Sequence, residues 1–355
     1  MDNNKKLVKY TPKDSVFLFL FILLIPQIFS AIVYAFVCSI CLKYGMTADE
    51  ISMSPAVLYI QYFSIYLAFA CIYFIYNKVR KIDCFKASNL SFKKINILQV
   101  VIVLVIGLIC LFGLNPISNM FQFGLEKIGY KTAGGADFFL SSPLNFVIVE
   151  FLVAFLPAVF EELTLRGVVF HGFKNGYSDK KSVLFSAILF MIMHLSLAQS
   201  VYQLFMGIVL ALVVLYTGNL FYSMILHFVN NFIIILSGYL TYGQPTETVT
   251  YTTFMDYFLP IVLAVVSVAL IVGLLYLLRK ITKYSKNKQV ESTNQDISQE
   301  KDISQNQETN EELIEQDVVN RQETNNQKND NKLVKICFIV CAVIWFLAVL
   351  MGFME

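Results

Sequence analysis

The chain has 355 residues, of which 57% are hydrophobic and 15% charged, and its mean hydropathy is +0.64. In a soluble domain about a quarter of all residues are charged, so this composition excludes an ordinary soluble domain. The formal net charge of +2 favours no charged partner. The sequence shows no nucleic-acid-binding module, and we expect no nucleic-acid partner.

Long apolar runs without charged residues follow one another along the chain, and a helix needs about 20 such residues to cross a bilayer. We predict an all-α fold, a polytopic bundle of about eight core transmembrane helices plus one C-terminal span. The predicted spans are 15–40, 55–76, 97–115, 143–170, 182–199, 201–218, 219–240, 257–278 and 336–354. Four lysines precede the first span, as in a signal peptide. Its apolar part is about twice the usual length, which indicates a retained span.

Along the chain, connecting segments that are rich in basic residues alternate with connecting segments that are poor in them. Lys and Arg gather before the first span and after the second, fourth and eighth spans, whereas the other loops hold few. By the positive-inside rule, all of these basic segments face the cytoplasm if the N-terminus does. We therefore expect a multi-pass protein of the plasma membrane, with its N-terminus and the segment 289–332 on the cytoplasmic side.

Residues 289–332 differ from the rest of the chain. They are rich in Asn, Gln, Glu and Asp and repeat the tetrapeptides DISQ and QETN. Such a composition cannot bury enough apolar surface to fold, so we expect a disordered linker. The predicted organisation is N-terminal transmembrane helices in 1–142, central helices in 143–240, a further span and basic segment in 241–288, the linker in 289–332 and the last span in 333–355.

Ionisable side chains inside a bilayer are costly and tend to be functional, and here they gather in three spans. The fourth, fifth and seventh spans contain Glu150, Glu161, Glu162, Arg166, His194 and His227, together with Asn231. At 1.5 Å per residue, Glu161, His194 and His227 lie roughly 15, 18 and 12 Å from the cytoplasmic ends of their helices. This agreement in depth predicts one shared site. Glu150 lies nearer the opposite interface, where we expect it to be solvated.

The spacing of these residues within each helix indicates which of them share a helix face. Glu162 and Arg166 are four residues apart, so they share a helix face and can pair, whereas Glu161 points about 100° away and is left free. His227 and Asn231 share a face in the same way. Simpler interpretations are a structural ion pair, histidines bonded to backbone carbonyls and an asparagine that joins helices.

Three motifs carry a family resemblance. EELTLR, FMIMH and HFVNN occur in this order on successive membrane helices. Together they resemble the CAAX protease and bacteriocin-processing family of intramembrane endopeptidases, also called the Abi family. The resemblance covers about residues 143–240, which would then form the catalytic helices.

This resemblance implies peptide-bond hydrolysis and assigns a role to each site residue. Glu161 would activate a water molecule with help from His194. Glu162 and Arg166 would hold the site together, and His227 and Asn231 would bind the developing oxyanion. A carboxylate withdrawn from water is a stronger base than a hydrated one, which suits this chemistry.

The sequence leaves two versions of the chemistry open. In the first, Glu161, His194 and His227 bind zinc or another divalent cation and leave a position open for water. In the second, Glu161 and His194 polarise the water without a metal. The sequence lacks the H-E-x-x-H motif, so the usual zinc-protease arrangement is excluded.

The expected substrate is a membrane-associated peptide or protein held in the lipid bilayer. The family spans CAAX prenylprotein processing, peptide-signal or bacteriocin maturation and self-immunity, and the sequence does not choose among them. One alternative is a proton- or ion-coupled transporter that uses the same Glu and His cluster as a relay. Transporters often carry inverted repeats, and this sequence holds no second copy of the cluster. The other alternative is a non-catalytic membrane scaffold.

Overall fold

The computed structural model describes residues 9–92, 95–131, 140–244, 251–298 and 312–354. Nearly all of these residues are helical, and no strand occurs among them. The structure therefore confirms the all-α class.

The elements follow the predicted spans closely. The N-terminal part contains α1 (Pro12–Lys43), α2 (Ala48–Ser52), α3 (Pro55–Arg80), α4 (Cys84–Ala87), α5 (Ile97–Ile109), η1 (Cys110–Leu114) and α6 (Asn115–Lys127). The central part contains α7 (Pro143–Val149), η3 (Glu150–Phe155), α8 (Leu156–Glu162), η4 (Leu163–Phe170), α9 (His171–Lys174), α10 (Asp179–Met193), α11 (Ser200–Thr217) and α12 (Leu220–Leu240). The C-terminal part contains α13 (Phe254–Ser298) and α14 (Glu312–Met354).

Eight helices in the described part of the chain are long and apolar enough to cross a membrane. They are Pro12–Lys43, Pro55–Arg80, Ile97–Lys127, Pro143–Lys174, Ser200–Thr217, Leu220–Leu240, Phe254–Ser285 and Asp330–Phe353. The chain is thus a polytopic helical membrane protein. Its assignment to the plasma membrane and the cytoplasmic side of its N-terminus stay predictions.

The fifth predicted span, 182–199, differs from the helix found there. Helix α10 has 15 residues and is therefore about 22 Å long, too short for the roughly 30 Å of a bilayer core. It ends at Met193, and Leu195 adopts a left-handed backbone conformation with a φ of 49°. Because a leucine in this region cannot continue an α-helix, the chain turns early and places His194 inside the bundle.

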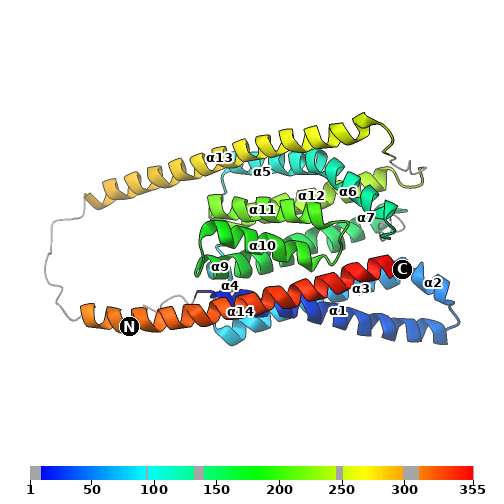
Figure 1. The fold of residues 1–355 in the computed structure, drawn as a ribbon, viewed down its shortest axis with the longest axis horizontal. Helices are drawn as coiled ribbons and strands as arrows, with labels where there is room; N and C mark the ends of the chain where they lie inside the picture. The colour runs from blue at the N-terminus through cyan, green and yellow to red at the C-terminus, as the bar shows by residue number, and fades with distance from the viewer. Residues whose placement is uncertain (1–8, 93–94, 132–139, 245–250, 299–311, 355) are drawn as a thin grey trace.

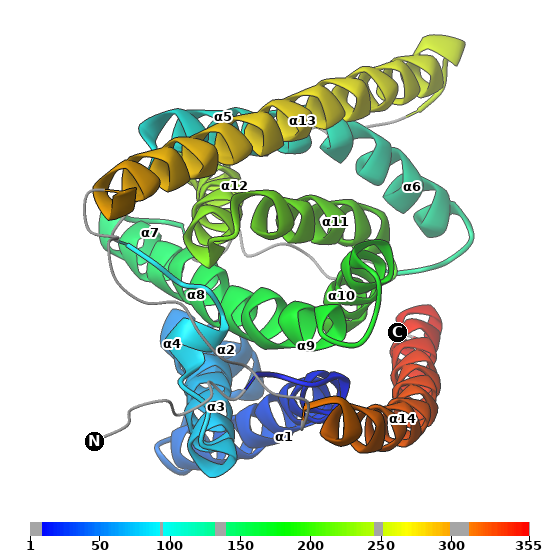
Figure 2. The ribbon, with the colours of Figure 1, turned by 90° about the vertical axis from the view of Figure 1, so that its left-hand side faces the viewer.

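The helices run roughly along the long axis of the molecule (Figure 1). Viewed from one end, α7 to α12 form a central group (Figure 2). Helices α5, α6 and α13 lie on one side of it, and α1, α3, α4 and α14 lie on the other. The C-terminal span packs against α1 and α10.

The basic segments gather at one end of the bundle, the left-hand end in Figure 1. There Lys13 Nζ lies 2.9 Å from Asp330 Oδ1 and links α1 to α14. Arg80 Nε lies 2.7 Å from Asp14 Oδ1 and links the end of α3 to the start of α1. We call this end the basic end.

The predicted linker is only partly described. Residues 299–311 lie outside the described part of the chain, and helix extends over 289–298 and 312–332 on either side. The disorder that we predicted for 289–332 stays a prediction. Glu, Gln and Lys lose little conformational freedom in a helix, so they can extend a helix that already crosses the membrane.

The fourth span is continuous from α7 to α9, but its backbone alternates between α-helical and π-helical turns. A π-helical turn widens the helix, changes which residues share a face and occurs often at functional sites. The α-helical segment α8 lies between the π-helical segments η3 and η4 and ends with Glu161 and Glu162. The two adjacent carboxylates therefore sit where the helix geometry changes.

Candidate active site

Glu162 is completely buried and accepts hydrogen bonds on both carboxylate oxygens. Arg166 Nη1 donates to Oε1 at 2.5 Å, as the four-residue spacing predicted. Ser223 donates its hydroxyl to Oε2, and His227 Nδ1 lies 3.0 Å from Oε1. This carboxylate therefore joins the fourth span to α12.

Arg166 is also completely buried and fixes two further helices. Its Nη2 donates to the carbonyl of Gly207 on α11 at 3.2 Å. Its guanidinium lies over the ring of Phe190 on α10, 4.4 Å from the ring centre, an attractive cation–π arrangement. Gly207 makes the close approach possible, since a Cβ there would lie 2.8 Å from Ala187 Cα. We call Glu162, Arg166, Ser223 and the Gly207 carbonyl the clamp.

Glu161 has a different environment from its neighbour. Tyr66 on α3 donates its hydroxyl to Oε1 at 3.2 Å. The other oxygen, Oε2, is buried and has no hydrogen-bond partner among the described residues. It lies 3.9 Å from His227 Nε2, which is too long for a hydrogen bond. One carboxylate oxygen is thus free to act on another group.

The two histidines are oriented by their other contacts. His194 donates from Nδ1 to the carbonyl of Phe190 at 2.8 Å; because a carbonyl only accepts, Nε2 carries the lone pair in the neutral ring. His227 is held from Nδ1 by Glu162, which turns Nε2 toward Glu161. The Phe190 ring packs edge-on against both imidazoles, with centroid distances of 4.8 and 5.7 Å.

Asn231 is held by a short chain of amides. Its Nδ2 donates to the carbonyl of Val153 in η3 at 3.2 Å. In an α-helix this carbonyl would accept from residue 157, which is a proline and has no N–H. Asn230 donates to Asn231 Oδ1 and accepts from the Tyr202 hydroxyl. The primary amide of Asn231 keeps a second N–H for another acceptor.

Glu161, His194, His227 and Asn231 line one cavity of about 490 Å³. Its other polar lining residues come from α3, α6, α11, α12 and the turn before α11, namely Tyr62, Tyr66, Asn115, Ser118, Asn119, Gln122, Gln199, Tyr202, Gln203 and Asn230. Val153, Pro157, Ala198, Ile234 and Ile235 supply apolar lining. The cavity therefore brings together the three residues that the sequence placed at one depth and Asn231, while Glu162 and Arg166 do not line it.

The predicted metal-ligand set is not assembled in this arrangement. Among the described residues, no group of three or more His, Cys, Asp and Glu side chains is placed to hold a metal ion. Glu161 Oε2 and His227 Nε2 face each other, but His194 does not complete a three-ligand site with them. The side chains therefore do not fit the zinc version as they stand.

Sequence reasoning missed several residues of this region. Ser223 lies four residues before His227, a spacing that signals a shared helix face. Asn230 is adjacent to a predicted residue, whereas Tyr66 lies on a distant helix and left no local signal. The expectation for Glu150 was wrong, because this carboxylate is buried and neither oxygen has a hydrogen-bond partner in the described structure. The side chain is enclosed by protein rather than by water, and it does not line the cavity.

The fold and the cavity define a polytopic membrane protein with a cluster of carboxylate, imidazole and amide groups inside its helix bundle. Residues 143–233 match the family model described as Type II CAAX prenyl endopeptidase Rce1-like. The match contains all six residues of the predicted site and confirms the resemblance to CAAX proteases. No curated protein and no solved structure matches the chain.

Proposed function

We propose that this protein is an intramembrane endopeptidase that hydrolyses peptide bonds of membrane-associated peptides or proteins. The observation that carries the proposal is the free Oε2 of Glu161, which faces an imidazole in a cavity inside the membrane bundle. A buried carboxylate oxygen without a hydrogen-bond donor is energetically unfavourable. The oxygens of Glu150 share this feature, but only the free oxygen of Glu161 belongs to a residue that lines the cavity, where it can act on a substrate. The family match over residues 143–233 supports a protease of the CAAX type.

In the proposed reaction Glu161 acts as the general base. It takes a proton from a water molecule whose oxygen attacks the carbonyl carbon of the scissile peptide bond. His194 accepts a hydrogen bond at Nε2 and helps to orient this water. The protonated Glu161 then transfers its proton to the departing amine when the carbon–nitrogen bond breaks, so that a carboxylate and an amine are released.

The negative charge that develops on the peptide oxygen needs donors. Asn231 supplies its second amide N–H, and one such donor contributes on the order of 3 kcal/mol in a dry site. When the ring of His227 is protonated, both of its nitrogens donate, and Nε2–H supplies a further donor. The clamp keeps these groups in place but does not touch the substrate.

The test is a comparison of membrane peptides from cells that produce the wild-type protein or the Glu161→Ala variant. We expect peptide ends that occur only with the wild-type protein. The matched control is Glu150→Gln, which alters a buried carboxylate of the same span that does not line the cavity and should leave those ends unchanged. Identical peptide ends with wild type and Glu161→Ala would overturn the proposal, and an ion-flux assay would then test the transporter alternative.

Chelation of the purified protein distinguishes the two versions of the chemistry. If Glu161 and His194 act on water unaided, the cleavage identified above should survive removal of divalent cations. Loss of cleavage with a chelator and its return with zinc would instead require the side chains to rearrange into a three-ligand site.

A further inference from the structure

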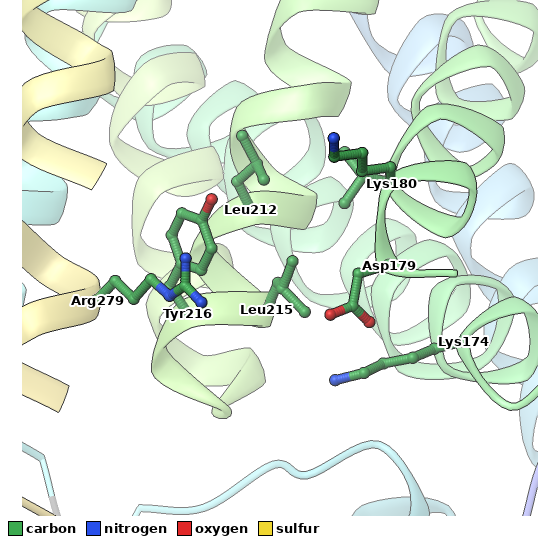
Figure 3. A pocket seen from close by; sticks show the side chains of 8 residues that line it. Lys174, Asp179, Lys180, Leu212, Leu215, Tyr216 and Arg279 are labelled. Atoms are coloured by element: carbon green, nitrogen blue, oxygen red, sulfur yellow. The ribbon is translucent and has the colours of Figure 1, made fainter. Parts of the chain in front are cut away.

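A second cavity, of about 500 Å³, lies at the basic end of the bundle, and Figure 3 shows the side chains that line it. It is formed where α9 ends, α10 begins and α11 ends, with α13 alongside. None of its lining residues lines the candidate active site. We call it the basic cavity.

Three cationic side chains from separate segments converge on the basic cavity. Lys174 comes from α9, Lys180 from α10 and Arg279 from α13, and Asp179 is the single acidic lining residue. Three positive charges and one negative charge give a net charge of +2. In the described part of the chain, none of the three cations lies within ion-pair distance of a carboxylate. As far as the described residues go, the charges of the cavity are available to an anion.

The rest of the cavity wall is apolar. Leu212 and Leu215 lie between the two sets of charged residues, with Lys174, Asp179 and Lys180 on one side and Arg279 on the other (Figure 3). Arg279 lies over the ring of Tyr216, 5.5 Å from its centre. Tyrosine is enriched at membrane–water interfaces, where one end of its side chain is apolar and the other wet.

The positive-inside rule explains why such residues occur at this end, but it does not explain their convergence. A topological signal needs only basic residues in the loop. Lys181 and Lys280 follow lining residues directly and would meet that need, yet they do not line the cavity. The cavity combines converging cations with an apolar wall at the ends of membrane-length helices, which matches an anionic group carried on an apolar chain.

We propose that the basic cavity binds a phosphate group, and that an anionic phospholipid of the adjoining leaflet supplies it. The guanidinium of Arg279 can bind two phosphate oxygens at once, and the two lysines act as mobile point charges. The leucines and the Tyr216 ring contact the first carbons of the lipid. Asp179 opposes the phosphate and weakens its binding.

The experiment measures lipid retention by the full-length protein purified from membranes and placed in bilayers of phosphatidylcholine containing phosphatidylglycerol. The cavity variant is Lys174→Gln, Lys180→Gln and Arg279→Gln combined. The control variant is Lys181→Gln, Lys280→Gln and Lys283→Gln combined, which removes the same charge beside the cavity. A cation that contacts the lipid headgroup contributes about fivefold to anionic-lipid binding, and only the cavity variant removes such cations. We therefore expect it to lose at least about tenfold of its phosphatidylglycerol enrichment. The control variant should keep most of it.

Two further measurements keep the result interpretable. Asp179→Asn should increase the enrichment, an effect that misfolding would not produce. Inorganic phosphate added without anionic lipid should stabilise the protein little. If phosphate stabilised the protein as much as phosphatidylglycerol does, the cavity would bind a soluble ligand, and the proposal that a lipid supplies the phosphate group would be wrong. Equal losses in the cavity and control variants, or no gain with Asp179→Asn, would overturn the site itself.

Discussion

Two adjacent carboxylates of the fourth span have opposite environments. Glu162 is completely buried and bonded to Arg166, Ser223 and His227. Among the described residues, Glu161 accepts one hydrogen bond, from Tyr66, and its second oxygen has no partner; the residue lines the cavity. The difference shows how one helix supplies both the structural and the reactive part of a site, because neighbouring residues point about 100° apart.

The largest loss of stability is expected for Arg166→Ala in the clamp. The change leaves Glu162 without its cation inside the bundle, and breaking a buried pair costs about 3–5 kcal/mol. Chemical or thermal unfolding of the purified protein measures it. Lys86→Ala is the control, because its pair with Asp83 is exposed and such pairs contribute little. Equal stability of the two variants would show that the clamp does not hold the bundle.

Asn231→Ala acts on the cavity side. It should lower kcat by about 10²–10³ and change KM little, because an oxyanion donor acts mainly in the transition state. The kinetics of the cleavage identified in membranes provide the measurement. Asn230→Ala removes the hydrogen bonds to Asn231 and from Tyr202 but leaves the Asn231 amide in place, so it should have a smaller effect. A rise in KM with unchanged kcat would assign Asn231 to substrate binding instead.

Gly207→Ala tests how tightly the clamp is packed. The added Cβ would lie 2.8 Å from the backbone of Ala187, so α10 and α11 must separate and the Gly207 carbonyl must move away from Arg166. Such overpacking costs about 1–3 kcal/mol. Gly273→Ala is the matched control, since a Cβ there meets nothing within 4 Å. Unfolding curves that do not distinguish the two variants would contradict this packing.

The smallest effect is expected for Tyr66→Phe, which removes the one hydrogen bond that Glu161 receives in the described structure. A hydrogen bond to a charged group is worth about 1.5–3 kcal/mol, so kcat/KM should fall roughly tenfold while the fold is kept. Tyr62→Phe changes a nearby cavity tyrosine and should alter the rate less. Comparing the two variants tests whether α3, which lies outside the family match, contributes to the reaction.

The sequence was sufficient for those parts of the site that depend on helix geometry alone. The fixed rise per residue placed Glu161, His194 and His227 at one depth, and the four-residue spacing paired Glu162 with Arg166. Contacts between helices that are distant in the chain were not predictable in this way. The Tyr66 hydroxyl and the Gly207 carbonyl reach the site only through packing of α3 and α11.

Two errors have local physical causes. The fifth span was predicted too long because apolar composition continues past Met193, whereas the left-handed backbone of Leu195 ends the helix. Glu150 was expected in water because a straight α-helix would carry it toward the interface. It instead begins the π-helical segment η3 and is buried there.

The most direct test of the central claim compares Glu161→Gln with Glu162→Gln in one preparation. Both variants remove one negative charge and keep the shape of the side chain. We expect Glu161→Gln to lose hydrolysis by about 10²–10⁴ with an unchanged Tm. We expect Glu162→Gln to lower the Tm clearly as well as the activity, because it weakens the clamp. Full hydrolysis by Glu161→Gln, or a loss of Tm as large as that of Glu162→Gln, would contradict the division between a reactive and a structural carboxylate.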